Sequence, residues 1–266
     1  MPSVLAIAAH PDDIEFLFAG TMLQLAARGY QLHYMNLCDG SKGSTTLPND
    51  QCAATRLAEA KQACEVLGAT FYEPIYPDME SQYTPANLRR VASVVRRCRP
   101  TIVLTHAPVD YMEDHEVACR LAVSAAFTHA MPNFHTDPPT DIYDHGVTVY
   151  HAQPYGNRTP MGQWVTPQYY VDTTDVIDRQ IESLACHKSQ KEWLDVSQGL
   201  GSYLDQMRRL AAEMGQASGR YQYAEGWRRR QHLGFCNEGD DPLADALSDC
   251  SCRSADDPAD SDRSSA

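Results

Sequence analysis

Two short segments combine imidazoles with carboxylates in a pattern that suits a metal ion. The first is His10-Pro11-Asp12-Asp13, and the second is Asp114-His115. A catalytic zinc site takes imidazole nitrogens and carboxylate oxygens as ligands and keeps one position open for water or substrate. We therefore interpret His10, one of the two aspartates and His115 as candidate ligands. The other aspartate is then free to face the bound water, and Asp114 can fix the orientation of an imidazole.

Each segment also has an ordinary structural explanation. Asp12 and Asp13 could cap a helix and complement its dipole. His115 could be a helix histidine without a function. Taken alone, each explanation is at least as good as a ligand role. The two segments together favour the metal site, because both follow predicted strands of one sheet.

The segments that must position these residues alternate between strand and helix. Apolar runs predict strands, and longer segments that end at glycine or cysteine predict helices. Alternation of this kind predicts a parallel sheet with helices on both faces. The carboxyl ends of parallel strands share the edge where ligands bind. The predicted strands are 4–9, 32–37, 71–76, 101–105, 147–151 and 169–171, and the predicted helices are 12–29, 50–68, 85–98, 114–127, 174–188 and 200–214.

An acidic segment ends the chain. The sequence has 266 residues and a formal net charge of −13. Residues 237–266 hold nine acidic side chains and two arginines, so they carry −7 of that charge. This segment has few large apolar residues. We therefore expect one domain over residues 1–236 and a tail over 237–266 that lies on the surface or is disordered, and that is dispensable for folding.

Composition excludes several classes of protein. The negative charge argues against a nucleic-acid binder. No run of 18 apolar residues predicts a membrane span, and no basic region precedes the first apolar run, so a secretory signal is not expected. The nine cysteines are dispersed, which is typical of reduced thiols in the cytoplasm. Cys250 and Cys252 form a close pair, which we interpret as incidental thiols rather than a metal site. A homo-oligomer is compatible with the sequence.

Several motifs resemble those of a known family. Val-Leu-Ala-Ile-Ala-Ala-His-Pro-Asp-Asp-Ile-Glu, continued by Ala19-Gly20-Thr21, is similar to the N-terminal signature of the LmbE-like, or PIG-L, family of zinc-dependent deacetylases. The family's order continues with Arg56 and Glu59, Asp78, Leu104-Thr105-His106, and Asp114-His115, with a less specific match at His187-Lys188-Ser189-Gln190. The resemblance implies a single Rossmann-like α/β domain with a mostly parallel sheet.

The resemblance also implies roles for individual residues. His10, Asp13 and His115 would hold one zinc ion per chain, although two imidazoles and one carboxylate suit other divalent metals too. Asp12 would be the general base. Arg56 and Asp78 fall where family members contact substrate. A surface ion pair of Arg56 with Glu59 and a turn role for Asp78 are the structural alternatives.

One position departs from the family pattern. Many family deacetylases have His-Pro-Asp-His where this chain has Met112-Glu113-Asp114-His115, and a thioether is not a useful proton donor. Tyr111, His106 and His232 are candidates to replace the absent histidine at the developing oxyanion. We favour His232, brought to the site by the segment from Tyr223 to Phe235. The run Arg228-Arg229-Arg230 in that segment is most simply a solvated face.

The resemblance implies a zinc-dependent hydrolase that removes an acyl group, most simply acetyl, from a small N-acylated amino sugar. The composition adds the expectation that the protein is cytoplasmic. Tyr111 is also expected to contact substrate, and His106 and Asp114 are expected to orient the ligands. One alternative is a zinc-dependent hydratase or lyase of an unsaturated keto-acid on the same scaffold, for which the absent histidine leaves room. Another is a non-catalytic sugar-binding module, in which Asp12 has no evident purpose.

Overall fold

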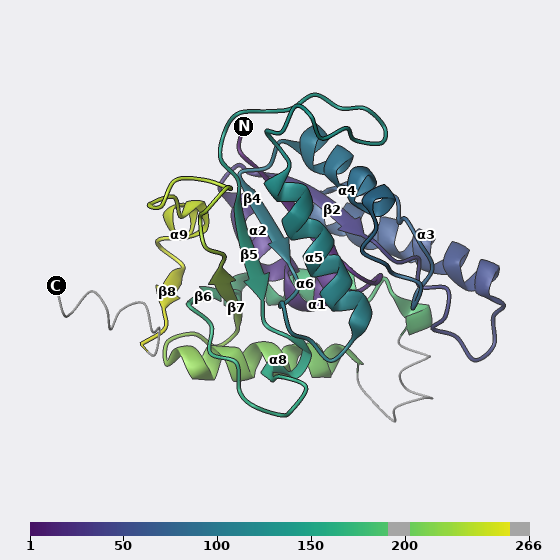
Figure 1. Ribbon diagram of the computed structural model, residues 1–266. Helices are drawn as coiled ribbons and strands as arrows, with labels where there is room; N and C mark the ends of the chain where they lie inside the picture. The colour runs from purple at the N-terminus through teal and green to yellow at the C-terminus, as the bar shows by residue number, and fades with distance from the viewer. Residues whose placement is uncertain (191–202, 256–266) are drawn as a thin grey trace.

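A single twisted sheet organises the chain (Figure 1). The computed structural model describes residues 1–190 and 203–255. Within them the sheet has eight strands in the order β3-β2-β1-β4-β5-β7-β6-β8. β1 to β5 run parallel, whereas β7 is antiparallel to β5 and β6, and β8 is antiparallel to β6. The predicted mostly parallel α/β fold is therefore confirmed.

The elements occur in alternating order over the first half of the chain. The strands are β1 (Ser3–Ala8), β2 (Gln31–Asn36), β3 (Thr70–Tyr72), β4 (Ile102–Thr105), β5 (Thr148–Ala152), β6 (Tyr169–Asp172), β7 (Ala224–Arg229) and β8 (Ser251–Arg253). The helices are α1 (Asp13–Leu17), α2 (Ala19–Ala27), α3 (Asn49–Leu67), α4 (Pro85–Cys98), α5 (Glu113–Phe127), α6 (Ile177–Leu184), α8 (Tyr203–Ser218) and α9 (Pro242–Ala246). Short 3₁₀ turns lie at η1 (Tyr155–Asn157) and η2 (Thr174–Val176).

Helices cover both faces of the sheet because its central strands are buried on both sides. Every residue of β1 is buried, as expected for a strand between two parallel neighbours. One face packs against α4 and α5, and the other against α2 and α3. In Figure 1, α4 and α5 lie in front of the sheet and α2 lies behind it.

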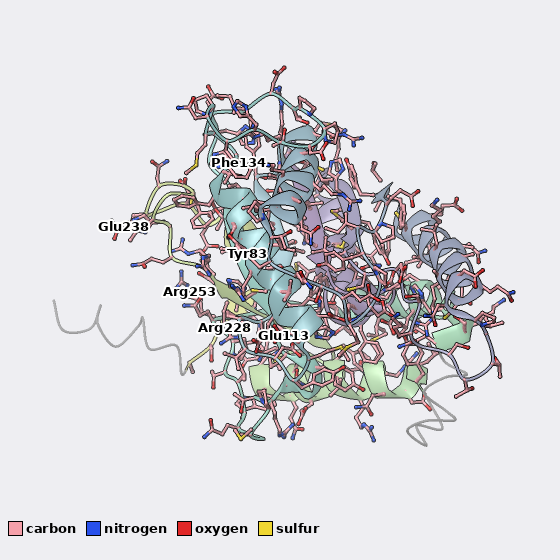
Figure 2. All side chains as sticks on the ribbon, turned by 45° about the vertical axis from the view of Figure 1, so that its right-hand side comes forward. Tyr83, Glu113, Phe134, Arg228, Glu238 and Arg253 are labelled. Carbon is pink, nitrogen blue, oxygen red and sulfur yellow. The ribbon has the colours of Figure 1, made fainter. Side chains whose placement is uncertain are left out.

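The strand order fixes where a site can form. The chain runs outward from β1 to β2 and β3 on one side, and from β4 to β5 on the other. The order therefore reverses between β1 and β4, and the loops that follow these two strands diverge to leave a crevice. The segments after β1 and β4 are the ones that carry His10 and His115. In Figure 2, Glu113 marks the lower end of α5, which is the end at this crevice.

β7 was not predicted, because its sequence does not look like a strand. Ala-Glu-Gly-Trp-Arg-Arg is largely polar. Its charged side chains are accommodated by other segments: the Glu225 carboxylate accepts hydrogen bonds from the backbone N–H groups of Gly20 (2.8 Å) and Thr21 (2.8 Å). Trp227 is fully buried and donates to Thr21 Oγ1 at 2.8 Å. Tertiary partners thus override a weak local pattern.

The expectation of an unstructured tail from residue 237 is wrong as far as residue 255. Leu243 of α9 and Leu247, the C-cap residue of this helix, pack into the core, where they are 1% and 0% exposed. β8 extends the sheet by pairing with β6. The Asp241 carboxylate accepts hydrogen bonds from the hydroxyls of Tyr150 (2.7 Å) and Tyr169. The domain therefore continues past residue 236, and residues 256–266 lie outside the described part of the chain.

Two further observations bear on the sequence-based expectations. All nine cysteines are free thiols, and Cys250 and Cys252 are half-buried. Within the described residues, no helix combines the length and apolar character needed to cross a membrane.

Candidate metal centre and active site

The turn after β1 carries three of the candidate residues. The backbone N–H of His10 donates to Asp13 Oδ2 at 2.7 Å, and the N–H of Asp13 donates to the His10 carbonyl at 3.2 Å. Asp12 lies between them, and its backbone φ of 115° falls in a region that residues other than glycine rarely adopt. Because the backbone bends sharply here, the side chains of Asp12 and Asp13 point in different directions. His10 and Asp13 converge on one point, and the Asp12 side chain occupies the adjacent wall of the cavity.

Three candidate ligands come together at this turn. His10 Nδ1 lies 3.5 Å from Asp13 Oδ2, and His115 Nε2 lies 3.5 Å from Asp13 Oδ1. The three side chains offer ligand atoms that all lie within 4.8 Å of one another. His115 enters from the first turn of α5, where Met112 is the N-cap residue. Distant segments of the sequence thus supply two nitrogens and one carboxylate to a single point.

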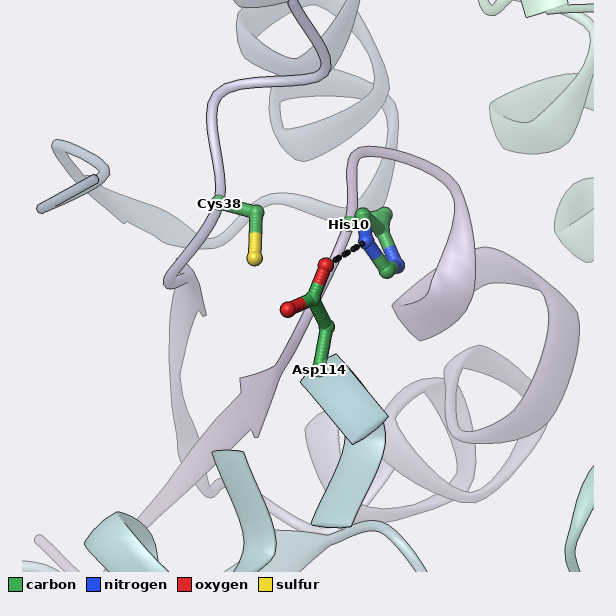
Figure 3. Close-up of side chains that lie close together, drawn as sticks. All are labelled: His10, Cys38 and Asp114. Carbon is green, nitrogen blue, oxygen red and sulfur yellow. Dashed lines mark hydrogen bonds and ion pairs between the residues drawn. The ribbon is translucent and has the colours of Figure 1, made fainter. Parts of the chain in front are cut away.

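Buried carboxylates hold the outer nitrogen of each imidazole. His10 Nε2 lies 3.1 Å from Asp114 Oδ2, as Figure 3 shows, and His115 Nδ1 lies 3.1 Å from Asp110 Oδ1. Asp114 and Asp110 are 1% and 5% exposed. Histidines that bind a metal almost always donate their other nitrogen in this way, which fixes the tautomer and leaves the inner nitrogen free as a ligand. This arrangement fits a divalent metal better than it fits two ordinary core histidines.

Further groups surround Asp114, the carboxylate that contacts His10. Figure 3 shows the thiol of Cys38 beside Asp114. The Asp114 carboxylate also accepts hydrogen bonds from the Met79 N–H (2.7 Å) and the Ser81 hydroxyl. These donors and His10 lower the pKa of Asp114 to about 2, against the opposing effect of burial. The carboxylate that orients His10 is therefore charged and firmly held.

The charge of the cluster depends on the mutual pairing of its members. Burial favours the neutral acid at Asp13, but His115 and His106 outweigh this and hold its pKa well below the usual range. Burial also opposes protonation of His10, yet its bonds to Asp114 and Asp13 raise its pKa well above the ordinary value. Without a metal, the buried carboxylates thus favour protonation of His10 and His115. A bound dication would displace those protons and supply the same positive charge.

Asp12 lies in a different environment from Asp13. It is 7% exposed, and the Tyr203 hydroxyl from α8 donates to its Oδ2. Burial, followed by the negative charge of Asp13, raises the pKa of Asp12 to about 6. Two neighbouring carboxylates whose pKa values are pushed apart are typical of sites with one anionic ligand and one proton carrier.

A cavity of about 430 Å³ opens over the candidate ligands. Arg56, Asp78, Tyr111 and Met112 all line it, together with Asp12. Arg56 is 2% exposed and donates to the Gly43 carbonyl at 2.6 Å. Asp78 accepts from the N–H groups of Gly40 (2.7 Å) and Lys42 (3.1 Å), so it shapes the loop after β2. Tyr111 is 56% exposed, and its ring lies edge-on to His115 at 5.4 Å.

His106 lies behind the cavity rather than in it. It is fully buried, and its Nε2 accepts the N–H of Ala9 at 2.9 Å and lies 3.3 Å from Asp13 Oδ2. Its ring stacks on His115 with centroids 4.1 Å apart. His106 therefore supports the positions of Asp13 and His115. It is not among the described residues that line the cavity, so it does not suit the role of oxyanion donor.

The structure does not bring His232 to the cavity, so the expectation that the segment after Tyr223 carries it to the site is wrong. β7 runs antiparallel to β5, so the residues after Arg229 lead away from the carboxyl edge of the sheet. His232 lies beyond the start of β5, where the N–H of Val147 donates to the Phe235 carbonyl at 3.0 Å. Figure 2 shows Glu238, a few residues farther on, far from Glu113 at the crevice. The sequence order could not reveal this reversal.

Sequence reasoning missed three residues of the site. Asp110 occurs in the sequence five residues before His115, a spacing that could have suggested the hydrogen bond that the structure shows. Tyr203 and Tyr155 come from the less regular second half of the chain, and no local signal connects them to Asp12. Both line the cavity.

The fold and the site define the class of the protein: a Rossmann-like α/β protein with a candidate metal centre at the carboxyl edge of its sheet. The profile of the family described as PIG-L, GlcNAc-PI de-N-acetylase, matches residues 5–127. A diacetylchitobiose deacetylase from Thermococcus kodakarensis is 31% identical over 234 residues, which cover 85% of this chain and 82% of that protein. The chain belongs to the PIG-L, or LmbE-like, family.

Other similar proteins include both deacetylases and hydratases. The 4-oxalmesaconate hydratase from Pseudomonas putida is 26% identical over 71% of this chain and 74% of its own length. The structure of N,N′-diacetylchitobiose deacetylase from Pyrococcus horikoshii matches with a TM-score of 0.72 and 25% identity, over 87% of this chain and 84% of that chain. The 4-carboxy-2-hydroxymuconate hydratase from Pseudomonas putida matches with a TM-score of 0.73 and 25% identity, over 86% of this chain and 96% of that chain.

Proposed function

We propose that this protein is a metal-dependent amide hydrolase that removes the acetyl group from an N-acetylated amino sugar. The observation that carries the proposal is the convergence of His10, Asp13 and His115 next to Asp12 on one cavity. The buried partners of the two imidazoles support a ligand role for them. Similarity to deacetylases of amino sugars supports the substrate class.

Zinc, or another divalent transition metal, would be held by His10, Asp13 and His115, and when bound it would acidify the attacking water and polarise the amide carbonyl. Asp12 would take a proton from that water, since Tyr203 engages its Oδ2 and leaves Oδ1 available. The same carboxylic acid would then give the proton to the departing nitrogen. The C–N bond breaks, the water oxygen remains on the acyl carbon, and acetate and a free amine leave.

Tyr111 is the candidate donor for the developing oxyanion. It lines the cavity close to His115, at the position next to Met112. Of the three residues considered from the sequence, it is the one whose side chain faces the cavity. Although the residue as a whole is 56% exposed, desolvation of its phenol by the neighbouring groups, followed by the negative charges of Asp13 and Asp110, raises the pKa of Tyr111 above the usual value for a tyrosine. Its hydroxyl therefore keeps the proton that it would donate.

The proposal predicts acetate release that depends on metal and on Asp12. The metal-loaded protein should release acetate from N,N′-diacetylchitobiose or N-acetylglucosamine, and a chelator should stop the release. Asp12→Asn keeps the shape but loses the base, so the rate should fall by about 10²–10⁴-fold. Metal content, measured by elemental analysis, should stay near that of the wild type. Wild-type turnover in Asp12→Asn would contradict the mechanism.

A hydratase that acts on an unsaturated keto-acid is the second candidate. Met112 lines the cavity where many family deacetylases have histidine, and the chain resembles a hydratase of Pseudomonas putida both in sequence and in structure. Loss of the ultraviolet absorbance of 4-oxalmesaconate, without acetate release from the amino sugars, would favour this candidate. Metal binding with neither reaction would favour a sugar-binding module.

A further inference from the structure

The loop between α5 and β5 forms another cavity, far from the candidate metal centre. The loop covers residues 128–147. Figure 2 shows Phe134 of this loop at the upper end of α5, whereas Glu113 marks the lower end, at the metal centre. The cavity has a volume of about 410 Å³, which is in the range of sites for small molecules. It shares no described lining residue with the cavity over the metal centre.

One face of α4 holds this loop in place. The carbonyl of Arg89 accepts the N–H of Asp137 at 3.2 Å, and Ser93 Oγ lies 2.8 Å from Thr140 Oγ1. Arg89, Ser93 and Arg96 are four and three residues apart, so they lie on the same side of the helix. The cavity is therefore formed by a loop that is tied to the core before any ligand arrives, which lowers the entropic cost of binding.

Arg96 lines the cavity and is a buried cation without an anionic partner. It is 3% exposed, and it donates to the carbonyls of Thr128 (2.8 Å), Met131 (2.8 Å) and Thr140 (3.2 Å). A guanidinium has five N–H groups, so these three bonds leave two, and Nε is without a partner in the described part of the chain. No carboxylate of the described residues pairs with it. Carbonyls carry no net charge, so the buried positive charge is not neutralised, which is unfavourable.

The rest of the lining suits an oxyanion that carries an apolar group. Thr136 is 6% exposed, and its Oγ1 accepts the N–H of Thr140 at 2.9 Å. No acceptor among the described residues takes the hydrogen of this hydroxyl, so it can donate to a ligand. The exposed His135 can add a ring N–H. The apolar part of the lining consists of Pro132, Phe134, Pro139 and Ile142.

Arg96 also has a structural explanation. It lies in the last turn of α4, where cations complement the helix dipole, and its bonds hold the loop. This explains the presence of an arginine, but not the cavity beside it or the unused N–H groups. Asp141 lines the same cavity with an exposed carboxylate that does not pair with Arg96. Its charge opposes an anion, which gives one of the experiments below its sign.

We propose that this cavity binds a small organic oxyanion, a phosphate or carboxylate attached to an apolar ring. The anion would lie against Arg96 and Thr136, and the ring against Phe134 and the two prolines. Phosphate and carboxylate both offer a guanidinium two acceptor oxygens in a matching geometry. The inference is independent of the proposed function, since the two cavities are separate.

Calorimetry on the full chain tests the proposal with three probes that share one ring. Phenyl phosphate and benzoate carry the anion, whereas benzyl alcohol is neutral. We expect one molecule of at least one anion to bind per chain, with a Kd below about 1 mM, and the tighter of the two identifies the oxyanion. Benzyl alcohol should not bind. Failure of both anions to bind, or equally tight binding of the alcohol, would overturn the proposal.

Substitutions of cationic residues locate the bound anion. Arg96→Met removes the charge and its donors, so binding should weaken about tenfold or more. Arg97→Met changes the exposed neighbour, and Lys42→Met removes a cation from the cavity over the metal centre; both should leave binding unchanged. Loss of binding in Lys42→Met but not in Arg96→Met would place the anion in the other cavity and contradict the inference.

Two exposed positions keep the test decisive if Arg96→Met does not fold. Ile142 is 40% exposed, and Ile142→Asp adds a negative charge to the lining, so it should weaken binding, whereas Ile142→Asn should change it little. Asp141→Asn removes a negative charge and should tighten binding. Low ionic strength keeps these effects measurable. If Ile142→Asp and Asp141→Asn both leave the affinity at the wild-type value, no anion binds in this cavity.

Discussion

At the scale of single residues, the candidate metal centre depends on which nitrogen of each imidazole is already engaged. Asp114 takes Nε2 of His10, whereas Asp110 takes Nδ1 of His115. The two rings therefore present different nitrogens to the same point next to Asp13. A sequence identifies a histidine as a candidate ligand, but only its neighbours determine the atom that binds.

Asp110 provides a test at this scale. Asp110→Ala leaves the outer nitrogen of His115 without its carboxylate, so the affinity for zinc should fall about 10–100-fold. Asp110→Asn keeps an acceptor oxygen, so its zinc affinity should fall less than that of Asp110→Ala. Competition with a chelating dye measures both affinities, and Asp144→Asn, at an exposed carboxylate, serves as the control. Wild-type zinc affinity in Asp110→Ala would show that the hydrogen bond does not support the ligand.

At the scale of elements, the C-terminal segment is part of the fold because a few of its residues fit prepared positions. α9 supplies Leu243 to the core, and β8 covers the edge of β6 that would otherwise present unpaired backbone groups. Average composition concealed these contacts, since the surrounding residues are acidic and small. A chain ending near Glu238 would lose all of them, so we expect it to be destabilised rather than unaffected.

Leu243 allows this to be measured without truncation. It is 1% exposed, and Leu243→Ala should lower the free energy of unfolding by about 2–5 kcal/mol, the usual cost of a cavity in a packed core. Leu233 is 62% exposed, so Leu233→Ala should change the free energy of unfolding by less than about 0.5 kcal/mol. Urea unfolding of the two variants provides the comparison. Equal effects would mean that α9 is not docked in solution.

At the scale of the whole molecule, Glu225 connects distant parts of the chain. From β7 it accepts N–H bonds from the start of α2 and a bond at 3.0 Å from Gln180 Nε2 on α6. Burial raises its pKa to about 7, against the opposing effect of these donors. Between the ordinary pKa of a glutamic acid and about 7, the folded protein thus holds a proton that the unfolded chain has released.

The sign of the resulting pH dependence follows from proton linkage. Because the folded state binds more protons in that window, Glu225 makes stability fall as pH rises, with a slope that reaches about 1.4 kcal/mol per pH unit. Glu225→Gln cannot titrate, so the difference in unfolding free energy between this variant and the wild type should change across the window and level off above pH 7. Urea unfolding at several pH values measures this difference in unfolding free energy, with Glu238→Gln at an exposed position as the control. A pH-independent difference would refute the raised pKa.

The local pattern of the sequence was sufficient for the first half of the fold. Alternating apolar runs and helical segments predicted β1 to β5 and α2 to α5 to within a few residues, because a buried parallel strand and the helix that covers it each leave a periodic signal. The same pattern predicted that His10, one of the two aspartates and His115 would meet at the carboxyl edge, and the family resemblance indicated Asp13 as the ligand. Predicting the meeting itself needed only the rule that parallel strands end on one side.

The tertiary structure decided what depends on the direction and partners of each element in the second half. Whether the chain after Tyr223 reaches the crevice depends on β7 being antiparallel to β5, and this orientation carries His232 away from the site. The contact of Tyr203 with Asp12 spans 191 residues, and Tyr155 meets Phe16 only because α8 and β5 pack beside the turn after β1. Such contacts have no period and no fixed spacing along the chain. The sequence by itself therefore determined the chemistry that the centre could perform, and the packing of the second half determined the walls that enclose it.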